Sequence, residues 1–238
     1  MTRFDTTQWT LVLAAGGDDS SAARDALAAL CEAYWYPLYA YLRRRGEPPD
    51  EARDLTQGFL ASLLARRGFD DLAPERGRFR AFLLAALKHF VANEAAARRA
   101  AKRGGGLRPL PLEIAGDEAE RRYRLEPPDP ATPETLFERR WALTVIERVL
   151  VALRRQWEAA GRAAEFDGLQ PCLLGDAPAG GYAAVARALG TTEGAVKVAV
   201  HRLRRRFHDE LRRQIAETVA GPDRVEDEIR HLIQALGA

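Results

Sequence analysis

The feature that most constrains the fold of this chain is the spacing of its apolar residues, which recurs near every 3.6 positions in each long segment. Such spacing places the apolar side chains on one face of an α-helix. No segment alternates apolar and polar residues as a half-buried strand does. The sequence therefore predicts an all-α fold, with helices over 22–44, 50–65, 78–99, 135–160, 182–189 and 190–211.

A stretch rich in proline and glycine divides these helices into two groups. Residues 104–133 open with three glycines and hold six of the thirteen prolines. Because proline disrupts helix interiors and glycine adds conformational freedom, we predict a flexible linker over 104–134. The predicted helical domains on its two sides are 1–103 and 135–218, followed by a C-terminal helical extension over 219–238 that packs on the second domain or covers its basic face.

The formal net charge is only +2, but it is distributed unevenly along the chain. Residues 139–213 carry 14 basic and 8 acidic side chains, whereas 104–138 carry 4 and 8 and 214–238 carry 2 and 5. This asymmetry indicates an anionic partner for the basic regions. No apolar run reaches the length of a membrane span, and the two cysteines are far apart in the sequence, so we expect no membrane span and a cytoplasmic location.

A helix-turn-helix is predicted over 182–213. Ala186 is small where two helices would approach, and Gly190 suits a left-handed turn. Thr191 and Thr192 offer N-cap oxygens to the second helix, which would enter a DNA major groove. That helix carries a cationic face opposite its apolar one; the alternative interpretation is a solvated face balanced by nearby acids. The face consists of Lys197, His201, Arg204, Arg205 and His208.

In the first half of the chain, residues 76–103 combine aromatic rings with many cations. This combination suits single-stranded nucleic acid, which needs stacking surfaces and positive charge. The alternative is that Phe79 and Phe90 belong to the hydrophobic core, while Phe82 fits either interpretation.

No pattern in the chain indicates catalysis. The four histidines do not share a motif with cysteines or carboxylates at metal-ligand spacing, and no glycine-rich phosphate loop is present. We therefore predict that the chain is not an enzyme and needs no metal or cofactor.

The order of these parts resembles the extracytoplasmic-function (ECF) group of the sigma-70 family, the promoter-recognition subunits of bacterial RNA polymerase. The resemblance covers 27–103 and 138–213, about two-thirds of the chain. It rests on the segments LCEAYWYPLYAYLRRRG, DEARDLTQGFLASLL, RGRFRAFLLAALKH and GAVKVAVHRLRRRF. It implies a sigma factor that directs core RNA polymerase to promoters and assists DNA melting, with the second domain a helix-turn-helix that lacks a β wing. The implied partners are core polymerase, promoter DNA and, in some members, an anti-sigma factor.

The resemblance also assigns residues. Asp54 and Gln57 match positions that bind the clamp helices of the largest polymerase subunit. Residues matching contacts with the melted −10 element are Arg76, Arg78, Arg80, Phe82, Lys88, His89, Asn93, Arg98 and Arg99. Residues matching contacts with the −35 element are Thr191, Thr192, Glu193, Lys197, His201, Arg204 and Arg205.

The chain departs from the common family pattern at several of these positions. Phe82 stands where tryptophan is usual, and Lys88-His89 replace an arginine-asparagine pair. Val198-Ala199 replace a frequent serine-arginine pair, which removes a candidate guanine-reading side chain. The rival interpretations are a stand-alone helix-turn-helix regulator with an N-terminal sensing or interaction domain, and a helical interaction protein that binds no DNA.

Overall fold

The computed structural model describes residues 21–65, 79–101, 116–125, 131–173, 180–219 and 221–237, and these residues are helical throughout except for short turns. Within these ranges there is no β-strand, so the predicted all-α fold is confirmed. The chain divides into two compact units. Unit 1 comprises Met1–Thr144 with Ala216–Ala238, and unit 2 comprises Val145–Ile215.

Helix α6 (Pro133–Ala159) contributes to both units, because the boundary lies between Thr144 and Val145. Its first half buries Leu136, Phe137 and Trp141, and its second half buries an equivalent apolar stripe in unit 2. The second domain was predicted to begin at residue 135, near the start of this helix, whereas unit 2 begins at Val145. Proline content locates where helices end, but it does not reveal that one long helix serves two hydrophobic cores.

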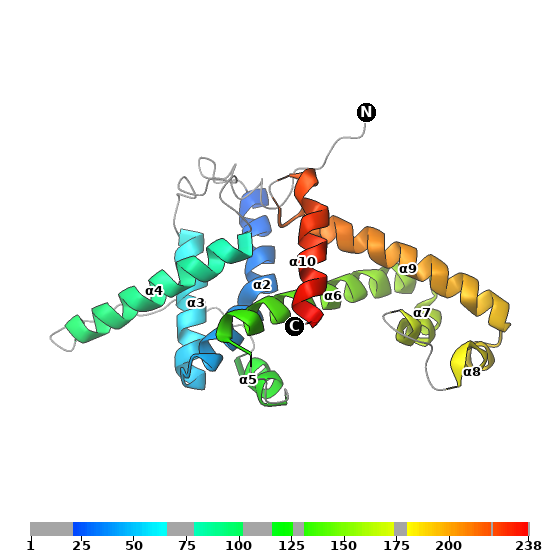
Figure 1. The fold of residues 1–238 in the computed structure, drawn as a ribbon, viewed down its shortest axis with the longest axis horizontal. Coiled ribbons are helices and arrows are strands. Elements are labelled where there is room, and N and C mark those ends of the chain that lie inside the picture. The colour runs from blue at the N-terminus through cyan, green and yellow to red at the C-terminus, as the bar shows by residue number, and fades with distance from the viewer. Residues whose placement is uncertain are drawn as a thin grey trace. The chain divides into compact units, whose positions relative to one another are not determined.

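Unit 1 is built on α2 (Ser21–Arg44) and α3 (Pro49–Ala65), which lie side by side (Figure 1). A turn through Gly46, at φ 95°, joins them, and only glycine adopts this conformation without strain. Helix α4 (Phe79–Ala101) packs against α3 and completes this part of the core. The Phe79 ring meets Tyr34 edge-to-face at 5.3 Å. Phe79 is buried, as its core interpretation predicted.

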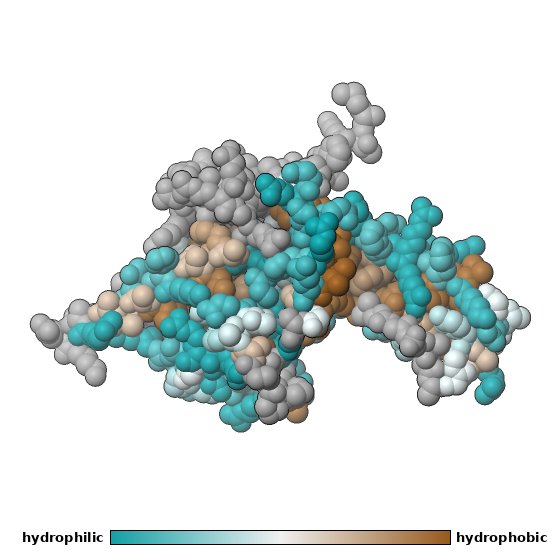
Figure 2. Space-filling model, in the orientation of Figure 1, coloured by the Kyte–Doolittle hydropathy of each residue, from teal (hydrophilic) through white to brown (hydrophobic). Residues whose placement is uncertain are grey.

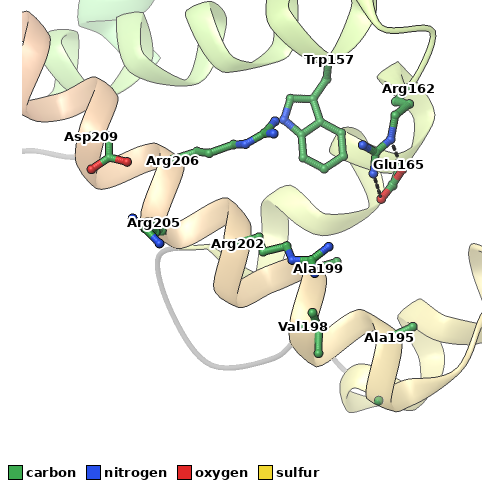
Figure 3. Close-up of a pocket in the computed structure, with 11 residues that line it drawn as sticks. Trp157, Arg162, Glu165, Ala195, Val198, Ala199, Arg202, Arg205, Arg206 and Asp209 are labelled. Carbon is green, nitrogen blue, oxygen red and sulfur yellow. Dashed lines mark hydrogen bonds and ion pairs between the residues drawn. The ribbon is translucent and has the colours of Figure 1, made fainter.

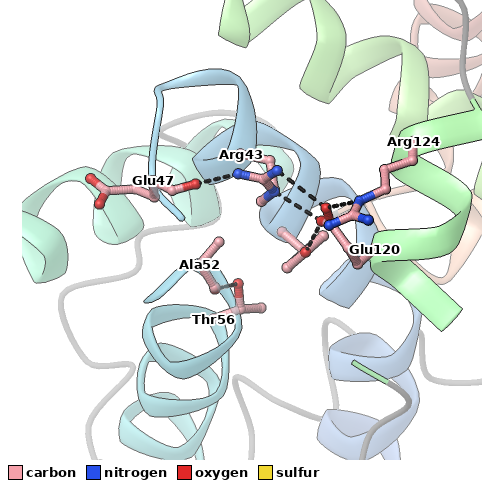
Figure 4. A network of polar contacts seen from close by, with 7 residues as sticks. Arg43, Glu47, Ala52, Thr56, Glu120 and Arg124 are labelled. Atoms are coloured by element: carbon pink, nitrogen blue, oxygen red, sulfur yellow. Dashed lines mark hydrogen bonds and ion pairs between the residues drawn. The ribbon is translucent and has the colours of Figure 1, made fainter. Parts of the chain in front are cut away.

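Helix α5 (Gly116–Leu125) lies inside the segment predicted as a flexible linker, and that part of the prediction was wrong. The ten residues contain no proline, and Glu120 forms an i,i+4 ion pair with Arg124 at 2.8 Å. The helix also docks on α2: Glu120 accepts hydrogen bonds from Tyr39 at 2.5 Å and Arg43 at 2.9 Å (Figure 4). Burial raises the pKa of Glu120, but these hydrogen bonds outweigh it and lower the pKa to about 2.

The C-terminal helix α10 (Val225–Gly237), preceded by the short helix η3 (Pro222–Arg224), belongs to unit 1. Its Glu228 is 3 % exposed and forms an ion pair with Arg80 of α4. Arg80 is 1 % exposed, forms a second ion pair with Glu138, and stacks over Trp141 at 4.2 Å. The prediction that the C-terminal extension packs on the second domain was therefore wrong. Glu228 of α10 instead pairs with the buried Arg80 of unit 1.

Unit 2 combines the second half of α6 with α7 (Ala163–Leu169), η2 (Gln170–Cys172), α8 (Gly181–Ala188) and α9 (Glu193–Ala216). The predicted helices over 135–160, 182–189 and 190–211 are confirmed to within a few residues. Beside the end of α8, a Cβ at Gly168 of α7 would lie 2.9 Å from the Leu189 side chain, so a larger residue at this position requires that side chain to move. The core side chains of this unit include Val149, Leu153, Trp157, Phe166, Leu169, Val196, Val200 and Leu203.

Candidate nucleic-acid interface

Helix α8, the turn from Leu189 to Thr192 and helix α9 have the element order of a helix-turn-helix. Gly190 in the turn has φ 64°, the left-handed conformation for which glycine was predicted. The backbone N–H of Thr191 donates to the carbonyl of Ala186 at 2.9 Å, which closes the end of α8. The turn is therefore fixed by backbone hydrogen bonds and by one glycine.

The N-terminus of α9 is capped by Thr192. Its Oγ1 accepts a hydrogen bond from the backbone N–H of Ala195 at 3.2 Å, and its carbonyl accepts from Val196 at 3.0 Å. This is the N-cap geometry expected from the sequence. Thr191 is exposed and closes α8 through its backbone N–H instead, so the two threonines differ in role.

The two sides of α9 differ sharply in polarity. Val196, Val200 and Leu203 are buried in unit 2, and the opposite side is exposed. Figure 2 shows the visible surface over α9 mainly in hydrophilic colours. One exception on the exposed side is Val198, which keeps half of its surface accessible. The exposed cationic and imidazole side chains are Lys197, His201, Arg202, Arg204, Arg205, Arg206 and His208.

Three charged residues of the predicted −35 set, Glu193, Lys197 and Arg204, have intramolecular partners. Lys197 forms an i,i+4 ion pair with Glu193 at 2.7 Å, and this hydrogen bond raises the lysine pKa. Arg204 donates from Nη2 to the backbone carbonyl of Cys172 at 2.8 Å, which ties α9 to η2. The Lys197 and Arg204 side chains stay exposed, but each already has a role in holding the local fold.

The side of α9 that carries Val198, Arg202 and Arg206 borders a groove of about 780 Å³ (Figure 3). This groove was not predicted from the sequence. We call it the arginine groove. It lies between α9 and the turn that joins α6 to α7, and it contains Arg162 from that turn. Arg202 and Arg206 lie in the segment GAVKVAVHRLRRRF, but nothing in the sequence places Arg162 beside them. The lining residues are Trp157, Arg162, Glu165, Gly194, Ala195, Val198, Ala199, Arg202, Arg205, Arg206 and Asp209.

In unit 1, the predicted −10 set does not form one accessible surface. Arg80 is buried with two carboxylate partners, so its assignment to DNA contact is corrected to a structural ion pair. Its burial depends on α6 and α10, which are distant in the sequence. Arg76 and Arg78 lie outside the described residues.

The remaining members of that set lie along α4. Lys88 forms an ion pair with Glu134 at 2.7 Å, and this hydrogen bond raises its pKa. His89 and Asn93 are exposed, whereas Phe82 is half-buried with its ring 6.4 Å from that of Phe79. The guanidinium of Arg98 pairs with Glu51 of α3, and that of Arg99 donates to the carbonyl of Ala95 at 3.0 Å.

The predicted polymerase-binding pair lies on α3. The side chain of Asp54 is 58 % exposed, while Gln57 is half-buried. Asp50 and Arg53 beside them form an ion pair at 2.8 Å. Arg53 also approaches the carboxylate of Asp54, at 4.0 Å, so this carboxylate is exposed on α3 but has a cation beside it.

Among the described residues, no three histidine, cysteine or carboxylate side chains come together as a metal site. Nor does any helix in those ranges have the length and apolar character needed to cross a membrane. Comparisons with protein-family models, curated proteins and solved structures found no match for this chain.

Proposed function

We propose that this chain is a sigma factor, which binds core RNA polymerase and directs it to promoters. The observation that carries the proposal is the exposed cationic side of α9 in a helix-turn-helix with a capped N-terminus. A helix so presented can enter a major groove with its N-terminal residues on base edges and its cations on phosphates. The family resemblance supplies the polymerase as the partner that this surface serves.

The side chains at the start of α9 fit base contact in part. Val198 is apolar and half exposed, and an apolar side chain in the major groove contacts the methyl group of thymine. Gly194 and Ala195 are small and exposed, so the helix can approach the base pairs closely. Cations beside them then contact the DNA backbone, which gives affinity that depends strongly on salt.

Unit 1 supports the proposal through α3 and α4. Asp54 presents a carboxylate that a basic helix of a partner can bind, and α4 exposes His89 and Asn93 on one side. In the proposed mechanism α4 holds the melted strand after bases leave the duplex, at a stacking cost of about a few kcal/mol that contacts with the protein offset. Arg80 takes no part in this contact, because it holds α4, α6 and α10 together.

Capture of core RNA polymerase tests the polymerase contact. We expect the full tagged chain to retain core polymerase, and the double variant D54A/Q57A to retain about tenfold less, as for loss of an interface hot spot. The matched control is Asp50→Ala, which removes a carboxylate that is 85 % exposed on the same helix. Equal capture by all three proteins contradicts the assignment of Asp54 and Gln57.

Recovery of no polymerase at all, together with tight and specific DNA binding by the free chain, favours the stand-alone regulator instead. A sigma factor alone is expected to bind promoter DNA weakly, because its two DNA contacts gain from being joined on one polymerase. The two interpretations therefore give opposite results in one pair of assays.

A further inference from the structure

The arginine groove carries more positive charge than the described residues neutralise. Arg202 and Arg205 have no carboxylate partner within the part of the chain that the structure describes, and both are exposed. Arg162 is held by Glu165 through two hydrogen bonds of 2.7 Å (Figure 3). Asp209 is the second acidic side chain of the lining. Four guanidinium groups therefore face two carboxylates, and one of those is already engaged.

The groove is also lined by Trp157, which is 5 % exposed. The guanidinium groups of Arg162 and Arg206 lie 4.6 Å and 5.8 Å from the centre of its indole ring. These cation–π contacts hold two flexible side chains near one position, so less entropy is lost when an anion binds.

Small residues leave room for a ligand at the rim on α9. Gly194 has no atom near the position of a Cβ, and Ala195 and Ala199 present only methyl groups. Guanidinium groups bind phosphate oxygens in a bidentate manner, which suits Arg better than Lys for this task. The chemistry of the groove is therefore that of a phosphate site.

We propose that the arginine groove binds backbone phosphates of the duplex DNA whose major groove receives α9. This inference rests on the proposed function and assigns Arg202 and Arg206 to DNA contact alongside Arg205, while Arg162, held by Glu165, adds positive charge beside them. Duplex DNA is the occupant because the groove is bordered by the first turns of α9, where Gly194 and Val198 line it. A helix seated in a major groove has a phosphate backbone along each side.

The opposite side of α9 contributes less to phosphate binding in this arrangement. There Lys197 is paired with Glu193, and Arg204 is hydrogen-bonded to the Cys172 carbonyl. To contact DNA on that side, Lys197 must exchange Glu193 for a phosphate, and Arg204 must share its N–H groups between the Cys172 carbonyl and a phosphate. The groove side therefore dominates the salt dependence of binding.

The salt dependence of DNA binding by the full chain tests the inference. The probe is a fluorescein-labelled duplex of about 20 base pairs, whose anisotropy is measured over about 50 to 200 mM salt, the range in which counterion release dominates. For the variant R202A/R206A we expect the slope of log K against log salt to fall by about 1.8, which is about 0.9 for each lost phosphate contact. Affinity at the lowest salt should fall at least about tenfold, as for loss of charge-assisted hydrogen bonds.

Two further variants control for charge and for folding. Arg155→Ala removes an exposed arginine of α6 that does not line the groove, and its slope should equal that of the wild type. R202K/R206K keeps both charges but loses bidentate geometry, so it should keep the slope and lose only part of the affinity. Far-ultraviolet circular dichroism shows whether each protein is folded, and Arg202→Ala alone serves if the double variant is not.

The possible outcomes distinguish failure of the groove assignment from failure of the proposed function. DNA binding by the wild type with an unchanged slope in R202A/R206A overturns the groove assignment and leaves the proposed function standing. Absence of DNA binding by every protein, including when polymerase is added, overturns the proposed function itself. Titration with inorganic pyrophosphate tests whether the groove binds another anion instead of DNA. If pyrophosphate binds saturably and requires Arg202 and Arg206, while these residues have no effect on DNA binding, the groove is a site for a small anion or an acidic protein. That result overturns the proposal.

Discussion

Replacing Arg80 by methionine should destabilise unit 1 without removing a DNA contact. The arginine is 1 % exposed, and its partner Glu228 is 3 % exposed, so the substitution removes a cation that pairs with a buried carboxylate. Loss of one partner from a buried ion pair costs about 3 to 5 kcal/mol, a large part of the stability of a typical domain. Trp141 also loses the cation stacked on its ring.

Urea unfolding measures this effect. With a denaturant sensitivity of about 2 kcal/mol per molar urea, the midpoint for unit 1 should fall by about 2 M. Hydrogen exchange of peptides from α4 and α10 should accelerate by the same free energy, because these helices are joined by the lost pair. The matched control is Arg99→Met on the same helix, where the exposed guanidinium bonds to the Ala95 carbonyl and to no other group in the described ranges, so the change should stay within about 0.5 kcal/mol.

A double variant tests the physical reason. In R80M/E228M both buried charges are removed, and replacement of a buried ion pair by apolar side chains is often neutral, so at least half of the lost stability should return. If Arg80→Met unfolds within about 1 kcal/mol of the wild type, or if the double variant is no better than the single one, the buried pair is not what holds α10 on unit 1.

Further predictions concern α5 and the helix-turn-helix. The pKa of Glu120 is lowered from 4.5 to about 2, so its ionised carboxylate contributes fully to the stability of unit 1 above pH 4.5, and this contribution disappears as the pH falls toward 2. Glu120→Gln should therefore lower the free energy of unfolding by about 2 to 3 kcal/mol at pH 7 and by almost nothing near pH 2, as measured by urea titrations at each pH. A cost that is independent of pH contradicts this account. Gly190→Ala, at φ 64°, should destabilise unit 2 by about 1 to 2 kcal/mol, whereas Gly194→Ala, inside α9 with open space around it, should be neutral or stabilising by up to about 1 kcal/mol in thermal melts; equal effects would contradict the left-handed turn. Thr192→Ala should cost about 1 kcal/mol through loss of the N-cap, and no loss would contradict the capping role.

Most of the helices were predictable from sequence because their apolar stripes and ends are local signals. The periodicity of α3, α4 and α6, the glycine of the turn and the cap of α9 all act within a few residues. The exposed cationic side of α9 follows from the same reasoning, since burying one side of a helix exposes the other.

The departures arise where distant segments meet. Arg80 has the same neighbours in sequence as an exposed arginine, and only α6 and α10 make it a buried ion. Helix α5 is flanked by prolines, and its stability depends on hydrogen bonds between Glu120 and α2 as well as on its own ion pair. The arginine groove was missed for the same reason, because Arg162 reaches it through the packing of Trp157 and α9.

The most direct test of the proposed function is transcription in vitro from genomic DNA with core RNA polymerase, with and without the purified chain. We expect transcripts that require the chain and whose start sites share a sequence upstream; D54A/Q57A should abolish them, while Asp50→Ala should not. Absence of chain-dependent transcripts, from a core polymerase that another sigma factor activates under the same conditions, would contradict the proposal that this chain is a sigma factor.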